Sequence, residues 1–305
     1  MKKITFLLVF ISIFGYSQTP ITDANIQTAV DLWVSDASAA TTAYGAISDW
    51  DVSQVTDMSE LFRDKTTFND DISNWDVSNV TNMKFMFSDA TSFNQDISAW
   101  NVSGAVNMRA MFYNATAFNQ DISSWDVSSV TGMEFMFYGT TVFNQPLNSW
   151  DVSSATDMRF MFKLATSFNQ PLNSWDVSSV DDMYSMFDTA TVFNQPLNSW
   201  DVSSVTDTRE MFRRATAFDG IITSWDVSSV TLLNGMFRDT SAFNQPIGIW
   251  QTGNVNDMID MFRDAAVFNK DLSTWCVTNI TTEPSFFSTN SALTSANKPD
   301  WGTCP

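Results

Sequence analysis

The chain has 305 residues and a formal net charge of −19, with 34 acidic side chains, 15 basic ones and no histidine. A charge of this sign disfavours nucleic acids and anionic membrane surfaces as partners. The absence of histidine removes the commonest general base and the commonest metal ligand, and we expect no enzyme.

Residues 1–18 have the zones of a secretory signal peptide. Lys2 and Lys3 precede an apolar run from Ile4 to Phe14, and small and polar residues follow up to Gln18. The run has 11 residues, whereas a helix needs about 20 to span a bilayer. We therefore expect cleavage, no transmembrane segment in the mature chain, and a location outside the cell or at its surface. An uncleaved anchor is the alternative.

Residues 19–46 are predicted to form an N-terminal helical cap. Apolar side chains recur at spacings of three and four along one side of a helix, and Asp23 stands where an N-cap residue belongs. These apolar residues are Ile26, Ala29, Val30, Trp33 and Val34. Such a helix would cover the hydrophobic cross-section that the first unit of a repeat array exposes to water.

Residues 47–275 repeat with a period of 25. Tryptophan marks the period ten times without an insertion, at Trp50, Trp75, Trp100, Trp125, Trp150, Trp175, Trp200, Trp225, Trp250 and Trp275. A fixed period of this length predicts an elongated body in which each unit packs only against its neighbours.

One coil shows two hydrophobic periods. Apolar and polar residues alternate around Trp75 to Ser78, which predicts a short strand. Beyond Thr81, a candidate N-cap, four apolar residues are spaced i, i+3, i+4, i+7, which predicts two to three turns of helix. They are Met83, Met86, Phe87 and Ala90.

The signature I-x-x-W-x-V-x-x-V-x-x-M-x-x-M-F-x-x-A-x-x-F-N runs, for example, from Ile72 to Asn94. It resembles the repeat of BspA-like leucine-rich-repeat surface proteins and the repeat blocks of some mycoplasma lipoproteins. The resemblance implies an α/β solenoid: a right-handed leucine-rich-repeat-like stack of about ten coils, with parallel strands on one face and short helices on the other. It also implies exposure outside the cell, adhesion or protein binding, and no enzymatic activity. An ordinary leucine-rich repeat has asparagine where this chain has Val80.

Two rows of residues are predicted to be structural. Asparagine recurs after the second phenylalanine of each coil, as at Asn94, Asn119 and Asn144, and its amide can bond to neighbouring turns. Trp75 and Trp125 are expected in the core rather than on a stacking platform for sugars or bases, because Trp75 shares a strand face with Val77.

Aspartates follow most of the tryptophans and allow two interpretations. Each carboxylate could bond to the serine two residues later, which we favour, or the row could take up Ca²⁺. The candidate ligands are Asp76, Asp126, Asp151, Asp176 and Asp201.

Basic residues gather in the expected helical segments, whereas the expected strand side has no lysine or arginine. This asymmetry predicts an acidic surface that prefers basic or cation-bridged partners. Aromatic residues at variable helical positions mark the other candidate surface. They include Phe85, Tyr113, Phe135, Tyr138 and Tyr184.

Residues 276–305 are predicted to form a C-terminal cap, in which Cys276 and Cys304 form a disulfide or remain two thiols. The combined hypothesis is a secreted or surface-exposed protein without catalytic activity that binds extracellular proteins. A structural, self-associating protein and a calcium- or glycan-binding module are the alternatives.

Overall fold

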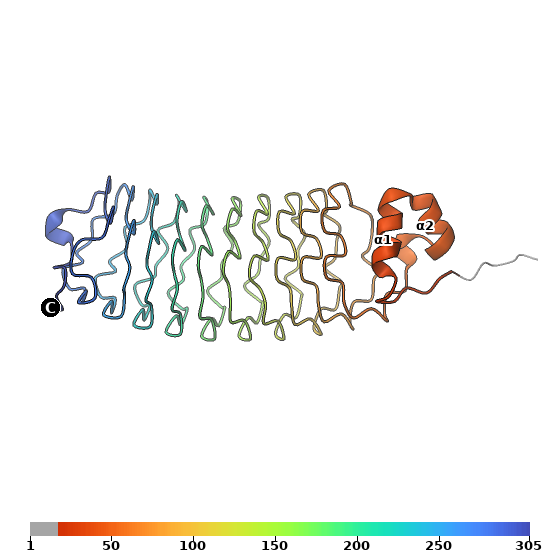
Figure 1. Cartoon of the computed structure of the whole chain (residues 1–305), viewed down its shortest axis with the longest axis horizontal. Coiled ribbons are helices and arrows are strands. Elements are labelled where there is room, and N and C mark those ends of the chain that lie inside the picture. The colour runs from red at the N-terminus through yellow and green to blue at the C-terminus, as the bar shows by residue number, and fades with distance from the viewer. Residues whose placement is uncertain (1–17) are drawn as a thin grey trace, which may run out of the picture.

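The computed structural model describes residues 18–305, which form a long stack of coils with helices at its two ends (Figure 1). Helices α1 (Ile26–Ser35) and α2 (Ala37–Tyr44) and the 3-10 helix η1 (Ile47–Asp49) precede the first coil. The 3-10 helix η2 (Ser295–Asn297) follows the last coil. The predicted signal peptide lies outside the described residues, apart from Gln18.

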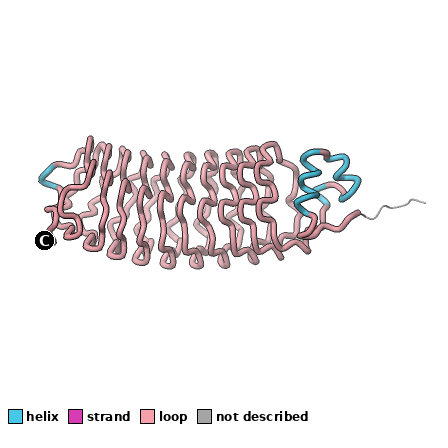
Figure 2. Tube along the Cα trace, in the orientation of Figure 1, coloured by secondary structure: helices cyan, strands magenta, loops and turns pink. Residues whose placement is uncertain are grey.

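The predicted parallel sheet is wrong. Within residues 18–305 no strand forms (Figure 2). Isolated parallel bridges join equivalent residues of successive coils, from Asp57 with Asn82 to Leu232 with Asp257. The expected strand segment leads into a tight turn, in which the Val80 N–H donates to the Val77 carbonyl at 2.9 Å. Its backbone groups therefore bond within the coil rather than along a neighbouring strand.

The predicted helices of the repeat are also wrong, so the chain is not an α/β solenoid. Along residues 83–90 the N–H groups alternate between two kinds of acceptor. The Phe85 N–H donates to the Arg109 carbonyl of the next coil at 2.9 Å, and the Met86 N–H closes a turn onto the Met83 carbonyl at 3.1 Å. Phe85 and Asp89 have φ angles of 56° and 58°. A right-handed helix excludes both features, because it needs negative φ and bonds four residues back.

The core contains the residues that the apolar spacing selected. Met83, Met86, Phe87 and Ala90 are fully buried. The Phe87 ring stacks on Phe93 of its own coil at 3.9 Å between centroids. The same stacking contact recurs in the following coils. Consecutive four-residue turns bury one side of the chain with almost the same spacing as a helix, so the pattern identified the buried residues but not the backbone conformation.

Side chains join the coils where the backbone does not. The indole N–H of Trp175 donates to the Leu147 carbonyl, 28 residues earlier, at 2.8 Å. The side-chain oxygen of Asn144 accepts from the Asn169 N–H of the next coil at 3.0 Å, and Gln170 donates to the Asn144 carbonyl at 3.1 Å. These bonds recur along the stack and satisfy turn backbone that has no other partner.

The N-terminal end is closed by α1 and by one carboxylate. Ile26, Ala29 and Val30 of α1 are buried. Asp23, which we expected to cap the helix, instead accepts hydrogen bonds from the Thr56 N–H and hydroxyl, each at 2.8 Å, and from the Asp57 N–H at 3.2 Å. The N-cap residue of α1 is Asn25, whose side chain makes no capping bond. Asp23 thus supplies the acceptors that a preceding coil would have supplied.

The C-terminal end is closed by a disulfide between Cys276 and Cys304. Trp301 packs edge-on against Phe287, with 5.0 Å between ring centroids. Phe286 beside it is 56% exposed and lies next to Arg263. The disulfide, this aromatic contact and backbone hydrogen bonds such as that from the Val277 N–H to the Thr303 carbonyl at 2.8 Å together hold the last coil.

Candidate functional site

One side of the stack changes from coil to coil, and we call it the variable face. It consists of the positions equivalent to 84, 85, 88 and 89 in each coil. Successive coils pair here through backbone groups, as in the bond from the Phe85 N–H to the Arg109 carbonyl. Since the side chains are not needed for this pairing, they are free to differ.

Five partly exposed rings gather on the variable face, and we call them the aromatic patch. They are Tyr113, Phe135, Tyr138, Phe160 and Tyr184. Tyr113 stacks on Tyr138 and Phe135 on Phe160, each with 4.5 Å between centroids. Phe160 meets Tyr184 edge-on at 4.7 Å. Burial, together with the neighbouring Tyr138 and Asp89, raises the pKa of Tyr113, so the patch keeps its hydroxyl protonated.

Cations lie over the exposed rings of this face. The Lys163 ammonium is 5.3 Å from the centre of the Phe160 ring, and the Arg209 guanidinium is 4.8 Å from that of Tyr184. Attraction between a cation and a ring face adds about 0.5–1 kcal/mol at exposed sites. These contacts hold the rim of the aromatic patch in place.

The variable face is not basic, which corrects the predicted segregation of charge. In the part of the chain that the structure describes, each arginine of this face has a carboxylate partner, at nearest distances between 2.5 and 3.5 Å. Lys163 pairs with Asp188 at 2.8 Å, and the Asp188 side chain is only 3% exposed. The face is therefore a mosaic of ion pairs with the aromatic patch among them.

The aspartate row lies on a different side of the coil and is exposed. Each carboxylate accepts a hydrogen bond from the N–H of the serine two residues later, at 3.0 or 3.1 Å. The row consists of Asp76, Asp126, Asp151, Asp176 and Asp201. Hydrogen bonds from the serine side chain and backbone lower the pKa of Asp76, Asp126 and Asp176. These three groups therefore stay ionised at neutral pH.

The aspartate row is also the Ca²⁺ site that the sequence offered as an alternative. Across residues 18–305 there is no group of three or more aspartate, glutamate or cysteine side chains arranged to hold a metal ion. Each carboxylate turns to its own serine, and Asn101 occupies the same position with the same bond, from the Ser103 N–H at 3.2 Å. A neutral amide can thus replace the carboxylate without loss of the turn.

The predicted structural tryptophans are buried, whereas the asparagines lie nearer the surface. Trp75 and Trp125 are each 3% exposed, so neither offers a ring face to a sugar or base. Asn94 and Asn119 accept from the next asparagine N–H at 2.8 and 2.9 Å, and Asn144 continues the same ladder. These tryptophans and asparagines stabilise the stack of coils rather than form a ligand site.

Sequence reasoning did not single out Phe160, Lys163 and Asp188, which complete the aromatic patch and its rim. The available signal was departure from the repeat. Phe160 occupies the position of Phe85 and Phe135, whereas other coils carry glycine, alanine, serine or an acidic residue there. A comparison of the coils at that single position would have found it.

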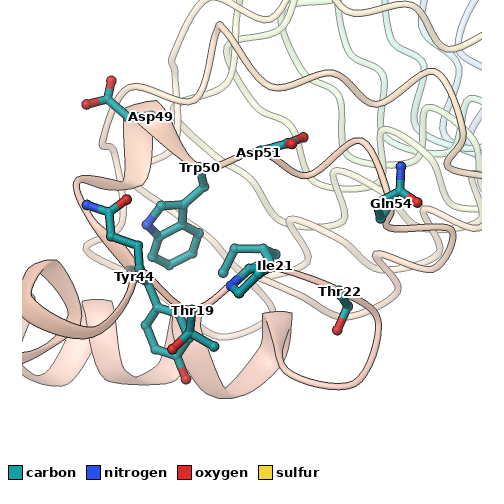
Figure 3. Close-up of a pocket in the computed structure, with 10 residues that line it drawn as sticks. Thr19, Ile21, Thr22, Tyr44, Asp49, Trp50, Asp51 and Gln54 are labelled. Carbon is teal, nitrogen blue, oxygen red and sulfur yellow. The ribbon is translucent and has the colours of Figure 1, made fainter. Parts of the chain in front are cut away.

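A shallow hollow lies at the N-terminal end, between residues 18–22 and the first coil. Figure 3 shows Ile21, Tyr44 and Trp50 beside it, with Asp49 and Asp51 around them. The Trp50 indole N–H is already bonded to the Gly45 carbonyl at 3.0 Å. We assign no chemistry to this hollow.

Neither α-helix of the described chain is long and apolar enough to cross a bilayer.

Comparison with known proteins gives a family. One family model matches residues 33–139, 119–220 and 197–301, and so spans nearly all the coils. No curated protein and no solved structure matches the chain. The match agrees with the resemblance to mycoplasma repeat proteins, but it does not show the BspA-like leucine-rich-repeat assignment. With three overlapping matches along its length, the chain belongs to the family described as "Mycoplasma protein of unknown function, DUF285".

Proposed function

We propose that this repeat protein acts outside the cell or at its surface, has no catalytic activity, and binds other proteins through the aromatic patch. The observation that carries the proposal is the cluster of five contacting, partly exposed rings on the variable face. Tyrosine, tryptophan and arginine anchors dominate the energetics of protein interfaces. Here two of those residue types adjoin on one surface.

The packing of the patch supports binding rather than simple exposure. The Phe135 and Phe160 rings are stacked at 4.5 Å, and Lys163 is fixed by Asp188 beside them. A ring held by its neighbours loses little conformational entropy when a partner covers it. The patch is therefore pre-organised for contact with an apolar protein surface.

The aspartate row supports a weaker alternative. Its carboxylates are exposed and regularly spaced, and a basic partner could follow them along the stack. Exposed charges contribute more to the rate of encounter than to affinity, however. We therefore place the affinity in the aromatic patch.

A capture experiment separates the two surfaces. The purified protein carries a photo-crosslinker and is incubated with the medium and surface extract of the producing cells. The Phe135→Ser, Phe160→Ser double variant should capture its crosslinked partners at least about 30-fold less, because one aromatic anchor at an interface contributes about 2 kcal/mol or more.

The matched control is the Asp151→Asn, Asp176→Asn double variant, which keeps the serine bonds as Asn101 does. It should retain the partners of the wild type. Equal capture by all three proteins would contradict binding at the patch, and selective loss in the control would assign binding to the aspartate row. Recovery of the chain only inside the cells would contradict the proposed location.

A further inference from the structure

One side of the central coils carries no charged residue, and we call it the uncharged face. It consists of residues 141–146, 166–171 and 191–196. The three segments read TVFNQP, TSFNQP and TVFNQP. Val142 and Val192 are 44% and 43% exposed, and the prolines that end the segments are also exposed. On a chain of net charge −19 this is a distinct surface.

Several polar groups of the uncharged face are already bonded between coils. The Thr166 hydroxyl donates to the Thr141 carbonyl at 3.3 Å, and the Asn169 N–H donates to the Asn144 side chain at 3.0 Å. Gln195 donates to the Asn169 carbonyl at 2.9 Å. These bonded groups keep their partners when the face is covered, and their side chains are already ordered, which lowers two main costs of association.

The apolar side chains of the uncharged face are arranged symmetrically. Along the stack one row reads Val142, Ser167, Val192 and the next reads Pro146, Pro171, Pro196. Both rows are the same in either direction about the coil of Pro171. The flanking coils end the proline row with Asp121 on one side and Ile221 on the other. A two-fold axis through the central coil would place Val142 of one copy opposite Val192 of another.

We infer that two copies of this chain pair through the uncharged face, antiparallel, about an axis at Pro171. A second copy has the same spacing between coils, so its valines and prolines stay in step over all three coils. The contact also keeps carboxylates apart, whereas pairing through the exposed aspartate row would bring the acidic groups of two copies together. A two-fold contact of this kind closes on itself and gives a dimer rather than a fibre.

The size of the contact sets its strength. Three coils span roughly 14 Å at about 4.8 Å each. Their area falls below the roughly 800 Å² per partner of a standard stable interface. The dimer is accordingly weak, and it forms at high micromolar concentration or where copies are crowded on a surface.

Sedimentation equilibrium of the purified protein tests the weak dimer. The protein concentration runs from about 10 μM to 1 mM, a range chosen for an interface of this size. We expect a monomer–dimer equilibrium that shifts toward dimer as salt is raised, because salt screens the repulsion between the acidic copies. Protein that stays monomeric at the highest concentration in both low and high salt overturns the inference. Dimerisation that weakens as salt is raised also overturns the inference.

Variants locate the contact. Val142→Asp should weaken dimerisation about tenfold or more, since a carboxylate would be covered without a partner. Ser92→Asp is the matched control, because it makes an exposed aspartate at the same position of a coil outside the uncharged face. Equal weakening by both substitutions overturns the location, and unchanged melting of both variants shows that the fold is intact.

The two-fold arrangement has its own test. Adding Val192→Lys to Val142→Asp should restore dimerisation, because the axis places the two positions opposite each other twice in each dimer. A parallel, side-by-side pair would instead set like charges against one another. Failure of the second substitution to restore the dimer overturns the antiparallel arrangement, and the aromatic patch is untouched by either variant.

Discussion

The sides of each coil differ in what joins them to the next coil. Along residues 83–89 backbone N–H groups donate to backbone carbonyls, as from Phe85 to Arg109. Around the tryptophan and the Phe-Asn turn, side chains make the bonds instead, as from the Trp175 indole to the Leu147 carbonyl. The side chains at the variable-face positions of the backbone-paired segment can differ, but only a residue with the right donor or acceptor can join coils on the other sides. The sequence therefore repeats where side chains join the coils or fill the core, and it varies at the variable face.

The largest test of this difference is to remove one tryptophan. Trp175 is 2% exposed and stacks parallel to Trp200 at 6.4 Å between centroids. Trp175→Ala should destabilise the protein by about 3–5 kcal/mol, because a large core side chain is lost and a cavity is left. Denaturant unfolding measures this. Phe160→Ala on the variable face should cost clearly less, and equal losses would contradict the distinction.

The last coil packs against a neighbouring coil on only one side, and a disulfide compensates for the missing contacts on the other side. Cys276 and Cys304 are bonded across a separation of 28 residues. Cys304→Ser should lower stability by about 3–4 kcal/mol by the loop-entropy estimate. Hydrogen exchange should show that the loss begins in the coil around Phe287. Unchanged protease resistance at this end would argue against the role of the link.

A single asparagine tests the side-chain ladder. Asn169 accepts from the Asn194 N–H at 2.9 Å, and Asn169→Ala leaves that donor without a protein partner. We expect a loss of about 1–2 kcal/mol in chemical denaturation. Asn169→Asp is the matched control, because Asp219 already holds the Asn244 N–H at 2.9 Å in the natural ladder. If alanine and aspartate behave alike, the ladder bond contributes little.

The buried residues were predictable from sequence, whereas the backbone was not. Spacing selected Met83 and Phe87 because a run of four-residue turns and a helix bury the same positions. The left-handed φ of Phe85, 56°, has no sequence signal, since phenylalanine rarely adopts it. The acceptor role of Asp23 depends on Thr56, 33 residues later, and so on the tertiary structure. The aromatic patch was predicted in part, from residues that depart from the repeat.

The backbone-paired side also contains strain that can be relieved. Thr189 has a φ of 64°, which is unfavourable for a β-branched residue. Asn114 and Asn290 adopt φ angles of 52° and 59° at equivalent places. Thr189→Asn should therefore stabilise the protein by up to about 1 kcal/mol, because asparagine tolerates this region. A thermal melt checks the sign, and destabilisation would indicate that the bond from the Thr189 hydroxyl to Asp188 outweighs the strain.

The smallest expected effect distinguishes the two sides by pH. Serine hydrogen bonds lower the pKa of Asp126 below its ordinary 3.8. The folded protein then binds fewer protons than the unfolded chain, so this stabilisation is present above pH 3.8 and is lost as the pH falls through the folded pKa. Burial and the neighbouring Asp207 and Asp157 raise the pKa of Asp182, which lies two residues before the variable-face position Tyr184, against the Tyr184 N–H bond. The contribution of Asp182 to the stability of the fold therefore has the opposite sign, and it falls as the pH rises through the raised pKa of Asp182.

Two isosteric substitutions separate these contributions. Asp126→Asn should reduce the acid sensitivity of the fold, because the amide keeps the serine bond without titrating. Asp182→Asn should raise stability at neutral pH, by less than about 1 kcal/mol since the group is partly screened. Asn82 and Asn107 already occupy equivalent positions and accept the same bonds, from Lys84 and Arg109, at 3.2 and 3.0 Å. Melting temperatures from pH 3 to pH 7 measure both, and a loss of stability in Asp182→Asn would mean that its ion pair with Arg159 outweighs the repulsion along the row.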